Sequence, residues 1–124
     1  MQLASMGAKA PPTPEHVIDS FIRDVKIHTD QITARGGKVV FLRPPSSGPL
    51  WKAEQMGFPR DKFWEKILAV TGCKGMHFAD YPELNRMNCT EFSHLRQSDT
   101  RIYTQKVVEF LSKDMGWKFK TTNQ

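Results

Sequence analysis

The run Lys38-Val39-Val40-Phe41-Leu42-Arg43 constrains the fold more than any other segment of this 124-residue chain. Its apolar residues are continuous and include β-branched and aromatic side chains, which is typical of a strand. Gly36-Gly37 precede the run and Pro44-Pro45 follow it, and these residues interrupt regular structure. Because apolar and polar residues do not alternate, we expect a strand that is buried on both faces, as in a parallel sheet covered by helices.

Helical patterns lie on both sides of this strand. Each begins with capping or first-turn residues and ends at glycine, as helices commonly do. A shorter apolar segment, Gly75 to Ala79, predicts a second strand, and Trp51 to Gln55 predicts one helical turn within a loop. The three predicted helices begin at Thr13-Pro14-Glu15, at Pro59-Arg60-Asp61 and at Ser98 or Asp99, and they end at Gly36-Gly37, Gly72 and Gly116.

Helices and strands therefore alternate, which is typical of α/β proteins with a parallel sheet. We expect a three-layer, flavodoxin-like partial domain with a short sheet at residues 14–116. An irregular N-terminal arm at residues 1–13 and a basic C-terminal tail at residues 117–124 flank this domain. Two strands leave both sheet edges open, so we expect a second copy of the chain, or a partner chain, to complete the sheet.

The charge and composition exclude several classes of protein. The 18 basic and 13 acidic residues are interspersed along the chain, which argues against a nucleic-acid-binding surface despite the net charge of +5. No apolar run reaches membrane-spanning length and no signal peptide is recognisable, so we expect a cytoplasmic protein without membrane attachment. The two cysteines do not make a disulfide framework, and whether they form a bridge stays open.

Several motifs occur in the order known from one hydrolase family. The chain resembles the C-terminal half of SGNH (GDSL-like) hydrolases and the related SGNH-like acyltransferases over residues 13–112, and the resemblance implies an SGNH-like fold. The Gly-Asp-Ser block and the Gly-x-Asn-Asp block of that family are absent. The matching segments are Gly36-Gly37, Phe41-Leu42-Arg43-Pro44-Pro45, Asp80-Tyr81-Pro82, Glu91-Phe92-Ser93-His94-Leu95 and Asp99 before the last helix.

The resemblance implies that His94 is a general base and that Glu91 orients it, although the family has Asp at the acid position. A base and its acid do not cleave an ester without a nucleophile and an oxyanion hole. We therefore expect a non-catalytic remnant or a small-ligand-binding module. The alternative is an esterase or acyltransferase component in which the Glu91–His94 dyad acts with a serine from another chain or with Ser46 or Ser47.

A ligand site is expected where the first strand ends. Parallel sheets bind ligands beyond the carboxyl ends of their strands, and Arg43, Ser46 and Ser47 lie at this position. An arginine with hydroxyl and amide groups can bind an anion, so a small acidic or ester ligand is one expectation. A proline-stiffened turn without a ligand is the alternative.

Other chemistry-bearing residues give weaker signals. The side chains of Cys73, His77, Cys89 and His94 are of the types that bind zinc, but their spacing matches no known zinc motif, so we expect no metal and no cofactor. The aromatic residues Trp51, Phe63 and Trp64 are expected in a core or an interface rather than in a substrate site.

Overall fold

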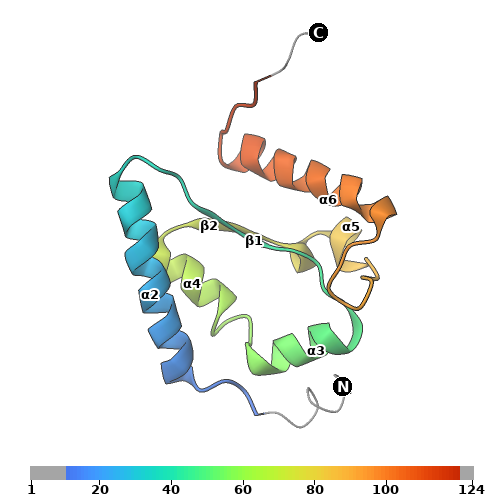
Figure 1. The fold of residues 1–124 in the computed structure, drawn as a ribbon, viewed down its shortest axis with the longest axis horizontal. Coiled ribbons are helices and arrows are strands. Elements are labelled where there is room, and N and C mark those ends of the chain that lie inside the picture. The colour runs from blue at the N-terminus through green and yellow to red at the C-terminus, as the bar shows by residue number, and fades with distance from the viewer. Residues whose placement is uncertain (1–10, 121–124) are drawn as a thin grey trace.

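The computed structural model of the protein describes residues 11–120. Most of the predicted arm and the last part of the predicted tail (residues 1–10 and 121–124) lie outside the described residues. Figure 1 shows two strands between helices. The elements, in chain order, are α2 (Glu15–Ala34), β1 (Val40–Arg43), α3 (Gly48–Gly57), α4 (Trp64–Thr71), β2 (Lys74–His77), η1 (Phe78–Asp80), α5 (Pro82–Asn85), α6 (Gln97–Glu109) and η2 (Phe110–Asp114).

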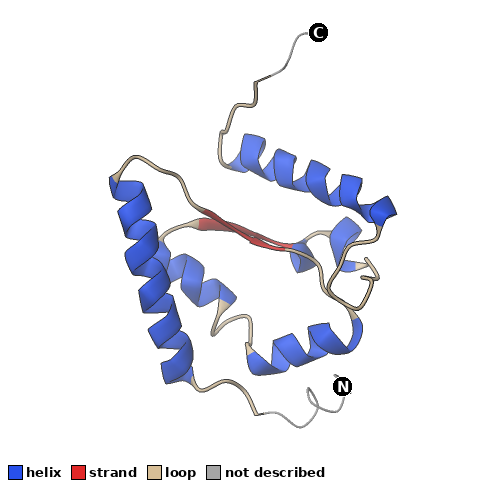
Figure 2. Ribbon diagram, in the orientation of Figure 1, coloured by secondary structure: helices blue, strands red, loops and turns tan. Residues whose placement is uncertain are grey.

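The sheet within residues 11–120 consists of β1 and β2, which pair in parallel. The register places Phe41 beside Gly75, Leu42 beside Met76, and Arg43 beside His77. Helices lie on both faces of the sheet: α2 and α4 on one face, α5 and α6 on the other (Figure 2). The predicted α/β class with a short parallel sheet is therefore confirmed.

Each face of the sheet has its own apolar core. Because side chains alternate along a strand, Phe41 points toward α2 and α4, where it packs against Ile18, Ile22 and Ile67. On the other face, Met76 joins a cluster that extends to α5, α6 and η2 and includes Phe78, Leu84, Met87 and Phe110. The two cores fix α4 and β2 relative to β1, and so fix the loops at the carboxyl ends of the strands.

The first helix agrees with its predicted limits but not with its predicted cap. Pro14 is the residue before α2, and no side chain caps this end by a hydrogen bond. Ile18 and Ile22 are buried, whereas Phe21 is 53% exposed although its helical spacing puts it in the same apolar stripe. It contacts the ring of Phe63 at a centroid distance of 6.0 Å.

The first strand is less buried than predicted. Leu42 is 40% exposed because α6 covers the region around Val40 and Met76 but leaves this part of β1 uncovered. The expectation of a strand buried on both faces was therefore wrong for Leu42. None of the helices within residues 11–120 has the length and apolar character of a membrane span.

Two further segments are more helical than predicted. The single turn expected at Trp51 to Gln55 is part of the ten-residue helix α3. Pro49 lies in the first turn of α3. Proline is favourable there because a backbone N–H at this position would have no partner within the helix. The segment after β2, for which no helix was predicted, contains η1 and α5, and β2 itself ends at His77 instead of Ala79.

Candidate functional site

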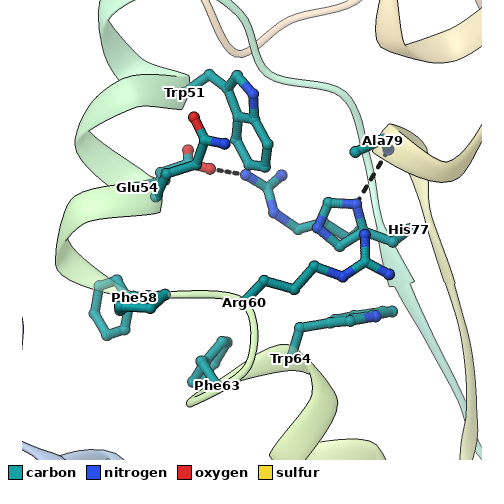
Figure 3. Close-up of a pocket in the computed structure, with 11 residues that line it drawn as sticks. Trp51, Glu54, Phe58, Arg60, Phe63, Trp64, His77 and Ala79 are labelled. Carbon is teal, nitrogen blue, oxygen red and sulfur yellow. Dashed lines mark hydrogen bonds and ion pairs between the residues drawn. The ribbon is translucent and has the colours of Figure 1, made fainter.

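Arg43 and His77 are the last residues of the two strands, and both line a cavity of about 580 Å³. The cavity therefore lies at the carboxyl end of the parallel sheet, where ligands bind in α/β proteins. Residues of α3, of the following loop and of α4 complete its wall (Figure 3). The lining residues are Arg43, Trp51, Glu54, Gln55, Phe58, Pro59, Arg60, Phe63, Trp64, His77 and Ala79.

Two tryptophans and two phenylalanines contribute aromatic surface to the wall. The His77 ring lies near both indoles, with centroid distances of 5.8 Å to Trp51 and 5.2 Å to Trp64. Phe58 and Phe63 form another part of the wall, and their centroids are 5.4 Å apart. Trp51 belongs to α3 and Trp64 to α4. The two rings face one cavity only because α4 is packed against the sheet. Large rings of this kind provide apolar surface with few rotatable bonds.

The guanidinium of Arg43 is held by several groups at once. Its Nη1 donates to the carbonyl oxygen of Pro44 at 2.6 Å, and its Nη2 donates to Ser46 Oγ at 2.8 Å. Its Nη2 also pairs with Glu54 Oε2, which accepts a hydrogen bond from Ser46 Oγ at 3.0 Å. The carbon Cζ lies 5.7 Å from the ring centroid of Trp51. Burial lowers the pKa of Arg43, but arginine stays charged at any physiological pH.

Arg60 forms a second charged network at the wall. Its two terminal nitrogens bind both oxygens of Asp80, at 2.7 and 2.9 Å, and its Nε donates to Glu65 at 2.8 Å. The hydrogen bond from Arg60 lowers the pKa of Asp80, and the hydrogen bond to Asp80 is the main cause that raises the pKa of Arg60. This network links the loop before α4 to η1, which follows β2.

His77 is a neutral imidazole at neutral pH. Burial lowers its pKa to about 4, and the positive charges of Arg60 and Arg43 add to this effect, whereas Asp80 and Glu65 oppose it. The ring nitrogen Nδ1 accepts a hydrogen bond from the backbone N–H of Ala79 at 3.1 Å (Figure 3). The neutral ring therefore carries its proton on Nε2.

The two predicted serines do not line the cavity. Ser46 is only 5% exposed, and its hydroxyl is used between Arg43 and Glu54. Ser47 Oγ accepts the backbone N–H of Cys89 at 2.9 Å, which connects the start of α3 to the segment after α5. Of the three residues predicted to bind an anion, only Arg43 lies at the cavity.

Glu91 and His94 lie close together on the surface, away from the cavity lining. Glu91 Oε2 is 3.9 Å from His94 Nδ1, and the two side chains are 82% and 73% exposed. Ser93 Oγ lies 3.4 Å from the same nitrogen. In a working triad the acid and the hydroxyl bind opposite nitrogens of the imidazole. Here both lie at Nδ1, so the arrangement does not match a proton relay.

The segment around this pair is a tight turn. The backbone of Thr90 pairs with that of His94, and the intervening Glu91 and Phe92 have φ values of 50° and 65°. Non-glycine residues in this left-handed region are uncommon. The turn is fixed to the start of α3 by a hydrogen bond of 3.0 Å from the Ser47 N–H to the Phe92 carbonyl oxygen.

The four side chains considered for zinc do not come together. His77 lines the cavity, His94 is on the surface turn, and Cys73 and Cys89 are both free thiols. Among residues 11–120 there is no group of three or more His, Cys, Asp or Glu side chains that could hold a metal ion.

Most of the wall residues were not predicted as a site. The sequence analysis assigned Trp51, Phe63 and Trp64 to a core or an interface, and His77 to a zinc set only. One signal was present: the last residues of two parallel strands share a sheet edge. If the second strand had been predicted to end at His77 instead of Ala79, His77 would have been expected beside Arg43 at that edge.

Comparisons of the chain with protein-family models, with curated proteins and with solved structures find no match.

Proposed function

We propose that this chain binds a small molecule in the cavity at the carboxyl ends of β1 and β2, and that it does so without catalysis. The observation that carries the proposal is the joint position of Arg43 and His77 at the wall of one aromatic-lined cavity of about 580 Å³. A volume of this order is in the range of small-molecule sites, which are mainly apolar with a few oriented polar groups.

The polar groups of the wall are oriented by contacts with other groups of the protein. Hydrogen bonds and ion pairs hold Arg43, Arg60 and His77. A site whose side chains are held in place loses little conformational entropy on binding. The fixed positions of these side chains support the proposal that the cavity binds a ligand.

The hydrolase alternative has one supporting contact, the 3.9 Å approach of Glu91 to His94. It has less support than ligand binding because that pair is exposed and because Ser46 and Ser47 make other hydrogen bonds. A likeness to the C-terminal half of SGNH hydrolases remains a hypothesis about the origin of the fold. The binding proposal does not depend on it.

We also propose that the chain self-associates through its sheet. Within residues 11–120 each strand pairs on one side only, and Leu42 of β1 is 40% exposed. Unpaired strand edges favour pairing with another chain. A second copy of the chain would contribute its own unpaired strand edge and its own exposed Leu42 to the contact.

The binding proposal is tested by closing the cavity. Gln55 is an exposed residue of α3 that lines the cavity, so Gln55→Trp adds bulk at its wall without changing a core. A matched control is Lys52→Trp, an exposed α3 position outside the cavity lining. A library of small aromatic fragments is screened by ligand-observed NMR. We expect fragments that bind the wild type and Lys52→Trp but not Gln55→Trp; binding that Gln55→Trp leaves unchanged, or no binding at all, contradicts the proposal.

A further inference from the structure

We infer that the ligand of this cavity is an uncharged, planar aromatic molecule with a hydrogen-bond acceptor, and that His77 Nε2–H donates to this acceptor. The inference rests on the proposed binding function and names the class of ligand. A carbonyl oxygen or a ring nitrogen is a suitable acceptor.

The donor follows from the hydrogen bond of the other ring nitrogen. Ala79 N–H donates to Nδ1 of His77 at 3.1 Å, so Nδ1 provides the lone pair and Nε2 carries the proton of the neutral ring. Within residues 11–120 the imidazole makes no further hydrogen bond. The side chain is 4% exposed and belongs to the cavity wall. A donor at a cavity wall that has no protein partner favours ligands with an acceptor, because a ligand without one leaves it unpaired.

The neutral state of this donor is stable over a wide pH range. The pKa of His77 is lowered to about 4, first by burial and then by the charges of Arg60 and Arg43. At neutral pH the ring therefore acts as a hydrogen-bond donor without a charge, and it offers no ionic attraction to a carboxylate.

The shape of the ligand follows from the rings of the wall. Trp51 and Trp64 lie on either side of His77 in Figure 3. Phe58 and Phe63 provide further aromatic surface at the cavity. Flat aromatic ligands pack well against such rings in stacked or edge-to-face geometry.

The charge of the ligand follows from the two arginines. Arg43 already pairs with Glu54, and Arg60 already pairs with both Asp80 and Glu65. An anionic ligand would have to compete with these carboxylates, and a displaced carboxylate would lose its partner. A cationic ligand would approach two guanidinium groups. An uncharged ligand avoids both penalties, so this inference departs from the expectation of an acidic ligand that was drawn from Arg43 alone.

Three bicyclic probes of similar size test the inference: quinoline has a ring-nitrogen acceptor, naphthalene has none, and 2-naphthoate is an anion. Their dissociation constants are measured at neutral pH by tryptophan fluorescence and by ligand-observed NMR. We expect quinoline to bind about five- to tenfold more tightly than naphthalene, which corresponds to one net hydrogen bond, and more tightly than 2-naphthoate.

Two substitutions of His77 separate the donor from the local hydrogen bond. In His77→Asn the amide oxygen can still accept the Ala79 N–H, but the donor at the Nε2 position is lost. In His77→Gln the amide NH₂ reaches the Nε2 position, while the acceptor for Ala79 N–H is lost. We expect the preference for quinoline to disappear in His77→Asn and to persist in His77→Gln, with folding checked by circular dichroism.

The outcomes distinguish this inference from the binding proposal. Equal binding of quinoline and naphthalene by the wild type, or tightest binding of 2-naphthoate, overturns the ligand class while the cavity remains a binding site. No binding of any of the three probes and of any fragment in the library contradicts the binding function itself. If the His77 variants do not fold, the three wild-type constants alone decide.

Discussion

Gly75 of β2 lies directly against the indole of Trp64: a Cβ at position 75 would be 2.7 Å from Cζ2 of that ring and 2.8 Å from Leu68 Cδ2. The missing side chain is thus what allows α4 to approach the strand. It also lets Trp64 form the wall of the cavity, since the ring lies between β2 and the open space.

Gly75→Ala should destabilise the protein although alanine is usually the better strand residue. The added methyl group must displace the buried indole of Trp64, and overpacking of this kind costs about 1–3 kcal/mol. The free energy of unfolding in urea measures the change. The matched control is Gly57→Ala, because a Cβ there meets nothing closer than 4.0 Å. Equal stabilities of Gly75→Ala and the wild type would show that the contact is not tight.

The predictable part of the fold came from local patterns. Continuous apolar residues around Phe41 predicted β1, and the glycine at position 72, with a φ of 70°, marked the end of α4 as expected. Burial within a helix was less predictable. Phe21 fits the apolar stripe of α2 with Ile18 and Ile22, yet it is 53% exposed while they are buried, and the spacing along the helix does not distinguish the three.

His77 should make stability depend on pH. Its pKa is about 4 in the folded protein and 6.5 in an unfolded chain, so the unfolded chain binds more protons between these values. Stability is therefore complete above pH 6.5 and falls as the pH decreases toward 4. Each pKa unit corresponds to about 1.4 kcal/mol, so the loss is at most about 3.5 kcal/mol.

Urea unfolding at several pH values between 4 and 6.5 measures this loss. His77→Asn has no titrating ring at this position and should give a flatter profile. Asp80 acts in a separate range: Arg60 lowers its pKa from 3.8, so its contribution is lost only at lower pH. A wild-type profile as flat as that of His77→Asn would contradict the buried neutral state.

Arg60→Ala should raise the pKa of His77. The guanidinium lowers this pKa, and its removal leaves the carboxylate of Asp80, which raises it. The shift is measured by NMR titration of the imidazole. The lost ion pair should cost about 1 kcal/mol or less, because its side chains are 39% and 50% exposed. Arg23→Ala removes the same charge from an exposed position of α2 and should leave the pKa of His77 unchanged.

The candidate site was less predictable than the fold because its residues are distant in sequence. Arg43 was assigned to a ligand site from its place at the end of a strand, and in the structure it lines the cavity. Its partner Glu54 was not foreseen, since a local pattern does not show which acid on α3 reaches it. Tryptophan is also common in protein cores, so the sequence does not mark Trp51 and Trp64 as site residues. They lie at one cavity because α3 and α4 both pack beside the parallel pair of β1 and β2.

The proposed self-association should depend on Leu42. Size-exclusion chromatography with light scattering is expected to show a dimer of the wild type, and Leu42→Lys should shift it to a monomer because a charge is placed on exposed β1 surface. The matched control is Ile27→Lys, at a position of α2 that is 54% exposed and outside the sheet. A wild-type monomer at micromolar concentration would rule out a stable dimer.

His94→Ala should change neither ester cleavage nor stability by a measurable amount. The imidazole is 73% exposed, its ion pair with Glu91 is long, and Ser93 approaches the same nitrogen as the acid. Exposed pairs contribute little to stability, and an acid and a hydroxyl on one nitrogen do not form a relay. Hydrolysis of a short-chain p-nitrophenyl ester by the wild type and by His94→Ala is the measurement, with Glu91→Gln as the matched variant. Turnover by the wild type that both substitutions abolish would revive the hydrolase alternative, because only a working dyad makes the rate depend on both side chains.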